Sequence, residues 1–352
     1  MSAAGAIDDA RWMASAIALS ERGRGRTAPN PNVGCVIVRD GHVVGRGWTQ
    51  PGGRPHAEAM ALNQAGASVQ GATVYVSLEP CAHESVRGPA CADLLASAKP
   101  ARIVVALTDP DPRTAGQGFA RLRAAGIAVT EGVGADAAQR AMAGFLTQQA
   151  SGRPHVTLKL ATSLDGRIAL ASGESKWITG AEARAHGHLE RARSDAILVG
   201  RGTYVADAPK LDVRLAGLED RSPRRFLLTT QNPFLPSDVE ARASGDTVRN
   251  TSFDFAQDER GWERIHDPEN IATLDHVDHL LVEGGALTAS AFLAADLVDR
   301  LLLYRAPILI GDGKIGICDI GLARLADAHG RWSLIDARAL GQDRLQIYER
   351  RR

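Results

Sequence analysis

The sequence predicts a two-domain α/β protein, and three observations support this fold class. The chain has 352 residues, whereas a single hydrophobic core rarely grows beyond about 250–300 residues. Short apolar, β-branched runs alternate with segments of helical periodicity. The polar segment Ser151-Gly152-Arg153-Pro154 interrupts this alternation. We therefore expect one α/β domain over residues 1–150 and a second over residues 151–352.

The elements of the first domain follow from apolar periodicity and turn residues. Helices are expected over residues 8–20, 57–65, 91–98, 119–125 and 135–149, and strands over residues 33–38, 73–77, 103–107 and 127–130. The dipeptide Asp40-Gly41 is typical of a hairpin turn, so the first strand should turn back at Val43-Val44.

The same reasoning predicts the elements of the second domain. Strands are expected over residues 156–160, 196–199, 226–229, 280–282 and 301–304, and helices over residues 181–192 and 287–293. A loop is expected between the strand at 196–199 and Arg214. Residues 231–278 are polar and poor in periodicity, which predicts an exposed excursion with one edge strand.

Composition limits the possible partners. The 41 basic residues equal the 41 acidic residues, which argues against a broad nucleic-acid-binding surface. The sequence shows neither a secretory signal pattern nor an apolar run of about 18 residues. Four cysteines are too few for a disulfide scaffold. We expect a cytoplasmic protein that acts on a small molecule, with no membrane or nucleic-acid partner.

A zinc site is predicted in the first domain. His56, Cys81 and Cys91 form a plausible protein ligand set for a catalytic Zn²⁺, with the fourth position left for water. Such a zinc ion lowers the pKa of its water toward about 7. Glu58 lies beside the ligand His56 and can carry a proton from that water to a leaving amine.

A structural role for the same residues is the competing hypothesis. The spacing between Cys81 and Cys91 would be weak evidence without the preceding His56-Ala57-Glu58 and Pro80. A purely structural zinc is the main competitor, but it gives Glu58 no role. Cys35 and Cys318 have no such context and are expected to be packing residues.

The second domain offers a possible phosphate-binding turn. It has no G-x-G-x-x-G fingerprint after its first strand. Instead, Gly284-Gly285 follows a strand and precedes a helix, where backbone N–H groups can bind a phosphate. On its own, this pair of glycines is more typical of an ordinary strand–helix turn.

Longer motifs connect the chain to a known family. The stretch Asn30-Pro31-Asn32-Val33-Gly34, the sequence HAE, the sequence LEPCAH and a downstream RGPAC resemble the deaminase half of the bifunctional riboflavin-biosynthesis deaminase/reductase family. Residues 159–166 and 173–179, with Ala206-Asp207-Ala208-Pro209, resemble its reductase half. The resemblance implies a cytidine-deaminase-like α/β/α domain followed by a dihydrofolate-reductase-like α/β domain.

The resemblance also implies site residues. For the deaminase, it implies zinc ligands His56, Cys81 and Cys91, the catalytic Glu58, and substrate contacts from Asn30, Asn32, His83 and Arg87. For the reductase, it implies NADPH contacts from Ala161, Trp177, Thr203, Asp207, Gly285, Ala286, Leu287, Thr288, Ala289, Ser290 and Ala291. Substrate contacts there would come from Ser175, Arg191, Leu211, Arg214 and Glu283, with Asp207 also catalytic.

The implied activity has two steps. The family removes an amino group from 2,5-diamino-6-ribosylamino-4(3H)-pyrimidinone 5′-phosphate, and then reduces the ribosyl side chain with NADPH. The family also suggests a homo-oligomer. This chain departs from the family pattern in a longer Cys81–Cys91 spacing, in Asp111 where Asn is usual, and in Ala208 where a second Asp is usual.

Two alternatives belong to other functional classes. One is a nucleic-acid or nucleoside deaminase with an accessory nucleotide-binding domain, which the balanced charge disfavours. The other is a non-enzymatic zinc protein, which Glu58 and the motifs of the second domain disfavour.

Overall fold

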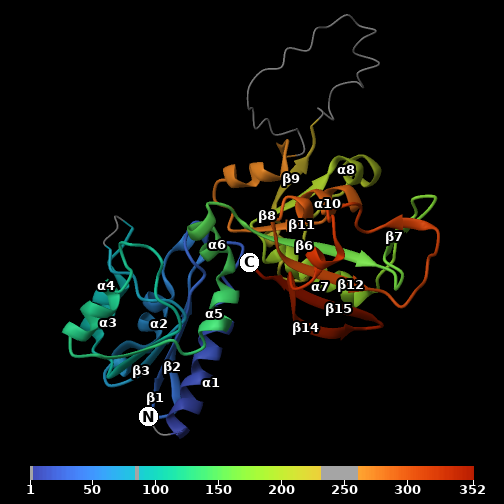
Figure 1. Ribbon diagram of the computed structural model, residues 1–352. Helices are drawn as coiled ribbons and strands as arrows, with labels where there is room; N and C mark the ends of the chain where they lie inside the picture. Colours follow the sequence, from blue (N-terminus) through green and yellow to red (C-terminus); the bar gives the residue numbers. More distant parts are fainter. Residues whose placement is uncertain (1–2, 84–86, 231–260) are drawn as a thin grey trace, which may run out of the picture. The chain divides into compact units, whose positions relative to one another are not determined.

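The computed structural model describes residues 3–83, 87–230 and 261–352 (Figure 1). The chain forms two compact units. The first comprises Met1–Gly152 with His276–Asp278, and the second comprises Arg153–Asp275 with His279–Arg352. Both units are α/β, as the sequence predicts.

The first unit is built on a five-stranded sheet with the order β2-β1-β3-β4-β5. Its strands are β1 (Gly34–Arg39), β2 (His42–Trp48), β3 (Thr73–Val76), β4 (Arg102–Val105) and β5 (Ala128–Glu131). The strand pair β1–β2 is the antiparallel hairpin predicted at Asp40-Gly41. Strands β3, β4 and β5 are parallel, so their carboxyl ends meet at one edge of the sheet.

Helices pack on the first sheet at close range. They are α1 (Ala3–Ser20), α2 (Ala57–Ala65), α3 (Cys91–Ala98), α4 (Gln117–Ala124), α5 (Ala135–Ala141) and α6 (Ala143–Ser151). Gly47 on β2 allows the start of α2 to approach the sheet, because a Cβ at Gly47 would lie 2.2 Å from the carbonyl oxygen of Ala57. Helices α2 and α3 begin and end where the sequence predicts.

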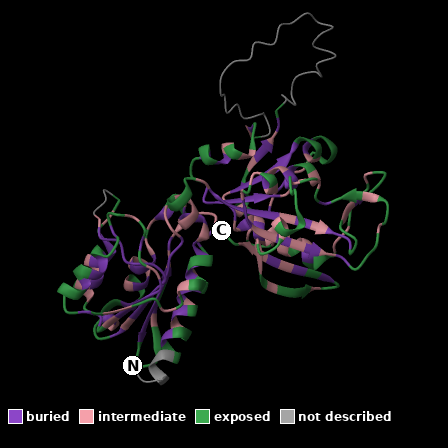
Figure 2. Cartoon of the chain, viewed as in Figure 1, coloured by how far each residue is buried: buried purple, intermediate pink, exposed green. Residues whose placement is uncertain are grey.

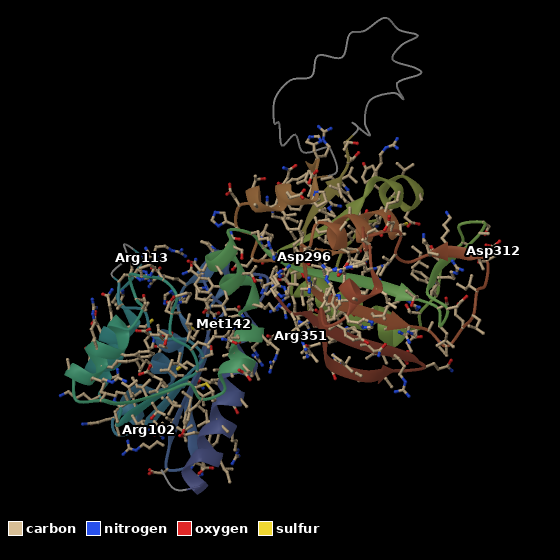
Figure 3. All side chains as sticks on the ribbon, in the orientation of Figure 1. Arg102, Arg113, Met142, Asp296, Asp312 and Arg351 are labelled. Atoms are coloured by element: carbon tan, nitrogen blue, oxygen red, sulfur yellow. The ribbon has the colours of Figure 1, made fainter. Side chains whose placement is uncertain are left out.

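The helix predicted over residues 135–149 is wrong as a single element, because it is divided into α5 and α6 (Figure 3). Met142 lies between them with non-helical angles of φ −105° and ψ 19°. The buried side chain of Asn32 donates hydrogen bonds to the carbonyl oxygens of Ala141, at 3.1 Å, and Ser20, at 3.3 Å. The carbonyl at the break is thereby bonded to a distant side chain, which no local pattern around residue 142 could reveal.

The second unit contains an eight-stranded sheet with the order β10-β9-β8-β11-β6-β12-β15-β14. Its strands are β6 (His155–Thr162), β8 (Ala196–Gly200), β9 (Arg224–Leu228), β10 (Trp262–Ile265), β11 (His279–Val282), β12 (Val298–Arg305), β14 (Trp332–Leu340) and β15 (Asp343–Arg350). The first six strands in this order, β10 through β9, β8, β11 and β6 to β12, are parallel. Strands β15 and β14 then pair antiparallel at the other edge. Strands β7 (Arg167–Leu170) and β13 (Gly313–Ile315) form a separate ribbon.

Among the described residues, the α-helices of this unit are α7 (Ala181–Ala192), α8 (Arg201–Asp207) and α10 (Ala286–Ala294). The loop predicted between residue 199 and Arg214 is wrong, because α8 occupies its first half. Gly202 and two β-branched residues weaken the helical pattern there. Buried Tyr204 stabilises the helix by packing edge-on against Trp262 of β10, with ring centroids 5.1 Å apart.

The edge strand predicted within residues 231–278 is confirmed as β10, which lies at the end of the sheet. Residues 231–260 of the predicted excursion lie outside the described residues. The prediction that the rest of it is exposed is wrong, because its apolar side chains are buried, namely Trp262, Ile265, Ile271, Leu274 and Val277. Strands β7, β13, β14 and β15 were not predicted; β14 is only half-buried or exposed along its length (Figure 2). None of the described helices combines the length and the apolar character that a membrane crossing requires.

A buried carboxylate stabilises the centre of the second unit. Asp299 on β12 accepts two hydrogen bonds from the Arg153 guanidinium, at 2.7 and 2.9 Å, and one from the backbone N–H of Val156, at 2.8 Å. Burial alone would raise the pKa of Asp299, but the hydrogen bond from Arg153, followed by the charge of His155, the hydrogen bond from Val156 and the charge of Arg153, lowers it to about 2.

We predict that Asp299→Asn lowers the free energy of unfolding by about 2 kcal/mol at neutral pH, which is the energetic equivalent of this pKa shift. Because the pKa falls on folding from 3.8 to about 2, the stabilisation is complete above pH 3.8 and is lost as the pH falls toward 2. The effect is measured by urea unfolding, with hydrogen exchange of β6 and β12 as the readout. Asp327→Asn is the control, since its ion pair with Arg324 is exposed. Equal stability of the two variants at pH 7 would contradict the prediction.

Candidate active sites

Three potential metal ligands converge in the first unit. The Nδ1 atom of His56 lies 3.6 Å from the Sγ atom of Cys81 and 3.3 Å from that of Cys91. All three donor atoms lie within 4.8 Å of one another. His56 immediately precedes α2, Cys91 is the first residue of α3, and Cys81 follows β3. Two helix starts and the carboxyl end of a strand therefore bring these side chains together.

The thiols of this cluster differ in their tendency to ionise. The hydrogen bond from Cys91 lowers the pKa of the Cys81 thiol to about 4, and His56 acts in the same direction. That hydrogen bond and burial raise the pKa of Cys91, which the charge of Arg54 partly opposes. The backbone N–H of Cys91 also donates to the Cys81 sulfur at 3.3 Å.

Glu58 is buried beside these ligands, with only 3% of its surface exposed. Burial raises the pKa of this carboxyl group to about 7, while the neighbouring His56 lowers it and Cys81 raises it further. A carboxyl group with a pKa near neutrality can both accept and donate a proton at physiological pH.

The cluster fits a zinc ion. Tetrahedral zinc with bonds of about 2.0–2.3 Å to nitrogen and sulfur places its ligand atoms roughly 3.5 Å apart. The two distances from His56 Nδ1 to the cysteine sulfurs, 3.6 and 3.3 Å, agree with that spacing. Three protein ligands of this type leave a fourth position for water or substrate, as in catalytic zinc sites.

A buried carboxylate inside the sequence LEPCAH, for which the sequence predicts no role, supports this cluster. Glu79 is 2% exposed and lies two residues before Cys81. Its Oε1 atom accepts hydrogen bonds from the backbone N–H groups of Gly118, at 2.9 Å, and Phe119, at 3.3 Å. Its Oε2 atom accepts from those of Asp109, at 3.3 Å, and Gly116, at 3.0 Å. Glu79 thus fixes the segment before Cys81 to residues 109–119, which comprise a loop and the start of α4.

A cavity of about 270 Å³ opens onto the ligands His56 and Cys91. It is lined by residues 54–56 and 87–89, together with Ala59, Cys91 and Leu94. Of the expected substrate contacts of this unit, Arg87 lines it, whereas Asn30, Asn32 and His83 do not.

The three other expected substrate contacts of this unit have neighbours of their own. A Cβ at Gly53 would lie 2.3 Å from Oδ1 of Asn30, so the Asn30 side chain lies against the segment that leads to His56. Asn32 is held by its bonds to the carbonyls of Ser20 and Ala141. His83 pairs through Nδ1 with the Thr114 hydroxyl at 3.3 Å.

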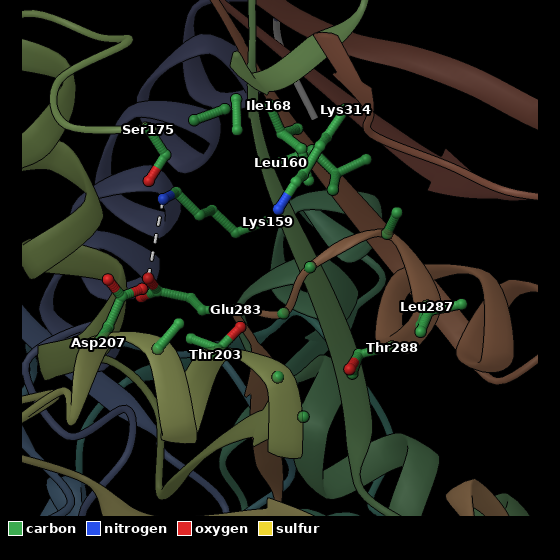
Figure 4. Close-up of a pocket in the computed structure, with 18 of the residues that line it drawn as sticks. Lys159, Leu160, Ile168, Ser175, Thr203, Asp207, Glu283, Leu287, Thr288 and Lys314 are labelled. Carbon is green, nitrogen blue, oxygen red and sulfur yellow. Dashed lines mark ion pairs between the residues drawn. The ribbon is translucent and has the colours of Figure 1, made fainter. Parts of the chain in front are cut away.

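The second unit contains a cavity of about 1050 Å³, shown in Figure 4. Most residues predicted to contact cofactor or substrate line it. They are Ala161, Ser175, Trp177, Arg191, Thr203, Asp207, Arg214, Glu283, Gly285, Ala286, Leu287 and Thr288. Ligand sites commonly measure about 300–1,000 Å³, so this volume suits two ligands together.

Four predicted residues do not line this cavity: Leu211, Ala289, Ser290 and Ala291. Leu211 is buried in an apolar cluster with Tyr204 and Trp262. Ala289 is fully buried. The Ser290 hydroxyl accepts a hydrogen bond from the backbone N–H of Cys318 at 2.7 Å.

Charged groups in the large cavity are mostly paired. The Arg191 guanidinium donates two hydrogen bonds to the Glu283 carboxylate, at 2.7 and 2.9 Å. Figure 4 shows the Lys159 ammonium directed at the same carboxylate, 3.7 Å away. Burial raises the pKa of Glu283, but Lys159 and Arg191 together lower it to about 2, so Glu283 is an anion at neutral pH.

Asp207 lies at the end of α8 and forms an ion pair with Lys176 at 3.5 Å. Trp177, which is 66% exposed, lies beneath the Arg184 guanidinium at 4.6 Å from its ring centroid. An aromatic ring at the wall of the cavity is open to stacking by a ligand ring.

Further residues that the motifs did not indicate line the two cavities. In the large cavity they include Lys159 and Lys314, and also Thr229, Thr230 and His266 near the ends of β9 and β10. In the small cavity the additional cation is Arg54. Lys159 lies inside the motif over residues 159–166, and Arg54 precedes His56 by two residues, so proximity to the motifs was the available signal.

Family models match both units of the chain. The cytidine and deoxycytidylate deaminase zinc-binding region matches residues 6–107, and the RibD C-terminal domain matches residues 154–345.

Whole-chain relatives agree with this division. The riboflavin biosynthesis protein RibD of Escherichia coli is 42% identical over 357 residues, which cover 92% of this chain and 94% of the relative. The RibD of Haemophilus influenzae is 39% identical and covers 95% of each chain.

Solved structures are similar over nearly the full length. RibD of Acinetobacter baumannii has a TM-score of 0.82 and 36% identity, covering 99% of this chain and 100% of that chain. A diaminohydroxyphosphoribosylaminopyrimidine deaminase/5-amino-6-(5-phosphoribosylamino)uracil reductase of Thermotoga maritima has a TM-score of 0.83 and 30% identity, covering 98% of this chain and 99% of that chain.

The fold and the two sites define a class of protein in which a zinc-binding deaminase domain precedes a reductase domain. The chain belongs to the RibD family of riboflavin biosynthesis proteins. It is a bifunctional enzyme of this pathway, both a deaminase and a reductase, and the nucleic-acid deaminase alternative is not favoured.

We predict that Glu79→Gln destabilises the loop that precedes α4, together with the start of that helix, by about 2–3 kcal/mol, the range for lost hydrogen bonds to a charged group. The NH2 group of the glutamine amide would replace one carboxylate oxygen. The two backbone N–H groups that donate to that oxygen would then have no acceptor. Hydrogen exchange of peptides from this loop measures the effect. Glu131→Gln, which alters an exposed pair with Arg123, is the control. Unchanged exchange in Glu79→Gln would refute this role.

Proposed function

We propose that residues 1–150 deaminate 2,5-diamino-6-ribosylamino-4(3H)-pyrimidinone 5′-phosphate and that residues 151–352 then reduce the ribosyl side chain of the product with NADPH. The observation that carries the first half is the convergence of His56, Cys81 and Cys91 within 4.8 Å, next to buried Glu58. The second half rests on the large cavity and on the RibD C-terminal domain match.

In the deaminase, His56 Nδ1 and the sulfurs of Cys81 and Cys91 would hold the zinc ion. When bound, zinc supplies the acidity that makes water a nucleophile at neutral pH. The Glu58 carboxylate takes the proton of the attacking water and returns it to the leaving amine. The buried surroundings of Glu58 exclude bulk water, which keeps that proton at the reacting atoms. Asn30 and His83 are proposed to hold the pyrimidine, and Arg87 the phosphate. Asn32, which is buried and bonded to the carbonyls of Ser20 and Ala141, would act on the site only through the backbone that it fixes.

In the reductase, NADPH supplies the hydride when bound. A cofactor at the start of α10 is supported by Gly285, which lines the large cavity immediately before the helix, where backbone N–H groups can bind a phosphate. Gly284 lets the Thr288 side chain pack against this turn, because a Cβ at Gly284 would lie 2.5 Å from it. Ala161, Trp177, Thr203, Asp207 and residues 285–291 are proposed to contact the cofactor. Those that do not line the cavity, Ala289–Ala291, would support the turn from within.

The carboxyl groups that could transfer a proton during the reduction differ in their charge state. Glu283 stays ionised because Lys159 and Arg191 hold its pKa near 2, so it cannot supply a proton at neutral pH. Asp207, the residue that the family resemblance implies to be catalytic, is the other carboxylate that lines the cavity near Thr203, and we propose that it moves the proton of ring opening. Ser175, Arg191, Arg214 and Glu283 would position the substrate, with Leu211 acting through packing.

The proposed function includes a cytoplasmic location and self-association. All four cysteines are free thiols, which supports a reducing compartment such as the cytoplasm. Self-association of the chain is part of the proposal and is tested by light scattering of the purified protein.

We predict that Glu58→Gln lowers the rate of ammonia release by about 10²–10⁴-fold, the range typical of a general acid–base group. Bound zinc should stay at one equivalent, because Glu58 is not among the three ligands. Ammonia assay and metal analysis of the same sample measure both quantities. Wild-type turnover by the zinc-loaded variant would exclude this mechanism.

We also predict the order of the two steps. In the full chain carrying Glu58→Gln, NADPH should be consumed with the deaminated pyrimidine but not with the diamino compound. The mass of the product and the absorbance of NADPH report the outcome. Equal NADPH consumption with both compounds would show that reduction does not require prior deamination.

A further inference from the structure

The rim of the small cavity carries two arginines from different segments. Arg54 comes from the segment before α2, and Arg87 comes from the segment before α3. The cavity that they line also reaches the ligands His56 and Cys91. Cationic groups at this rim therefore face whatever ligand occupies the space above the metal cluster.

Arg54 lies directly against the backbone of the opposite segment. Its Nη1 atom is 2.9 Å from the position that a Cβ would occupy at Gly88. Gly88 also has φ +143°, which L side chains rarely adopt. A glycine at this position gives the Arg54 guanidinium room at the cavity wall.

Arg87 reaches in the reverse direction. Its Nη2 atom donates a hydrogen bond of 2.7 Å to the carbonyl oxygen of Gly52, two residues before Arg54. Each arginine therefore contacts the segment that carries the other. This crossed arrangement places both guanidinium groups at the wall of the same cavity.

No carboxylate neutralises Arg54 within the described part of the chain. Arg54 is half-buried, and neither an ion pair nor a hydrogen bond engages its guanidinium there. A half-buried cation without a carboxylate partner is stabilised when an anion binds it. Guanidinium groups suit phosphate oxygens, because their planar N–H forks donate two parallel hydrogen bonds.

We propose that Arg54, together with Arg87, binds the phosphate of the deaminase substrate and sets the preference of this site for phosphorylated pyrimidines. This inference rests on the proposed function and adds Arg54 to it. The phosphate does not react, so its contacts are the same in the ground state and the transition state. Arg54 consequently contributes to KM and leaves kcat unchanged.

The test compares Arg54→Gln with Arg46→Gln in the full, zinc-loaded chain. Arg46 is an exposed residue of β2 outside the cavity, so its substitution makes the same charge change elsewhere in the unit. Ammonia release is measured with the phosphorylated substrate and with the same compound lacking its phosphate. For Arg54→Gln we expect KM for the phosphorylated substrate to rise about 10–100-fold, the effect of losing hydrogen bonds to a charged group. The kcat of Arg54→Gln should equal that of the wild type. Its KM for the unphosphorylated substrate should also be unchanged. The Arg46→Gln variant should have wild-type kcat and KM with both substrates.

Two further measurements separate binding from folding. Inorganic phosphate should inhibit the wild type competitively and should inhibit Arg54→Gln at least tenfold more weakly. Bound zinc should be equal in both proteins. Arg54→Lys, which keeps the charge but loses the fork, should give an intermediate KM.

Each outcome has a distinct meaning. If Arg54→Gln resembles Arg46→Gln, or weakens both substrates equally, Arg54 does not bind the phosphate and the inference fails while the proposed function stands. If the wild type releases no ammonia from the phosphorylated pyrimidine, the proposed function and this inference fail together.

Discussion

The structure depends on one physical requirement: a carboxylate buried at the end of a strand must find donors for its oxygens. In the first unit, Glu79 follows β3 and accepts four backbone N–H groups. In the second unit, Glu283 follows β11 and is paired with Arg191 and Lys159. Both carboxylates lie beside the functional groups of their unit. The network that satisfies each of them also fixes the geometry of a site.

The convergence of His56, Cys81 and Cys91 could be predicted because the sequence patterns that indicate it are local. The helices that begin at Ala57 and Cys91 are set by the residues immediately around them, and the structure has both helices where the sequence predicts. Cys81 follows a strand whose apolar residues were equally clear. Since each ligand stands at the end of such an element, local reasoning was sufficient to bring them together.

The features that the sequence did not reveal depend on contacts between distant residues. The break at Met142 accompanies the bond from Asn32 to the Ala141 carbonyl, across 109 residues. Helix α8 is stabilised by Tyr204 against Trp262. Strand β14 lies at the sheet edge with much of its surface exposed, so no alternating apolar pattern marks it. The crossing of Arg54 and Arg87 has the same origin, since the two side chains meet only in the folded unit.

The two cavities differ in whether their cationic side chains already have carboxylate partners. In the large cavity, Arg191 is already bound to Glu283 and Lys176 to Asp207. A phosphate that binds Arg191 must therefore share that cation with an existing carboxylate partner, which offsets part of the attraction. At the small cavity, Arg54 has no carboxylate partner among the described residues, so an anion there gains the full interaction with its charge. A net charge of zero over the sequence therefore does not exclude anionic ligands, because their attraction depends on the charges at each site rather than on the sum over the sequence.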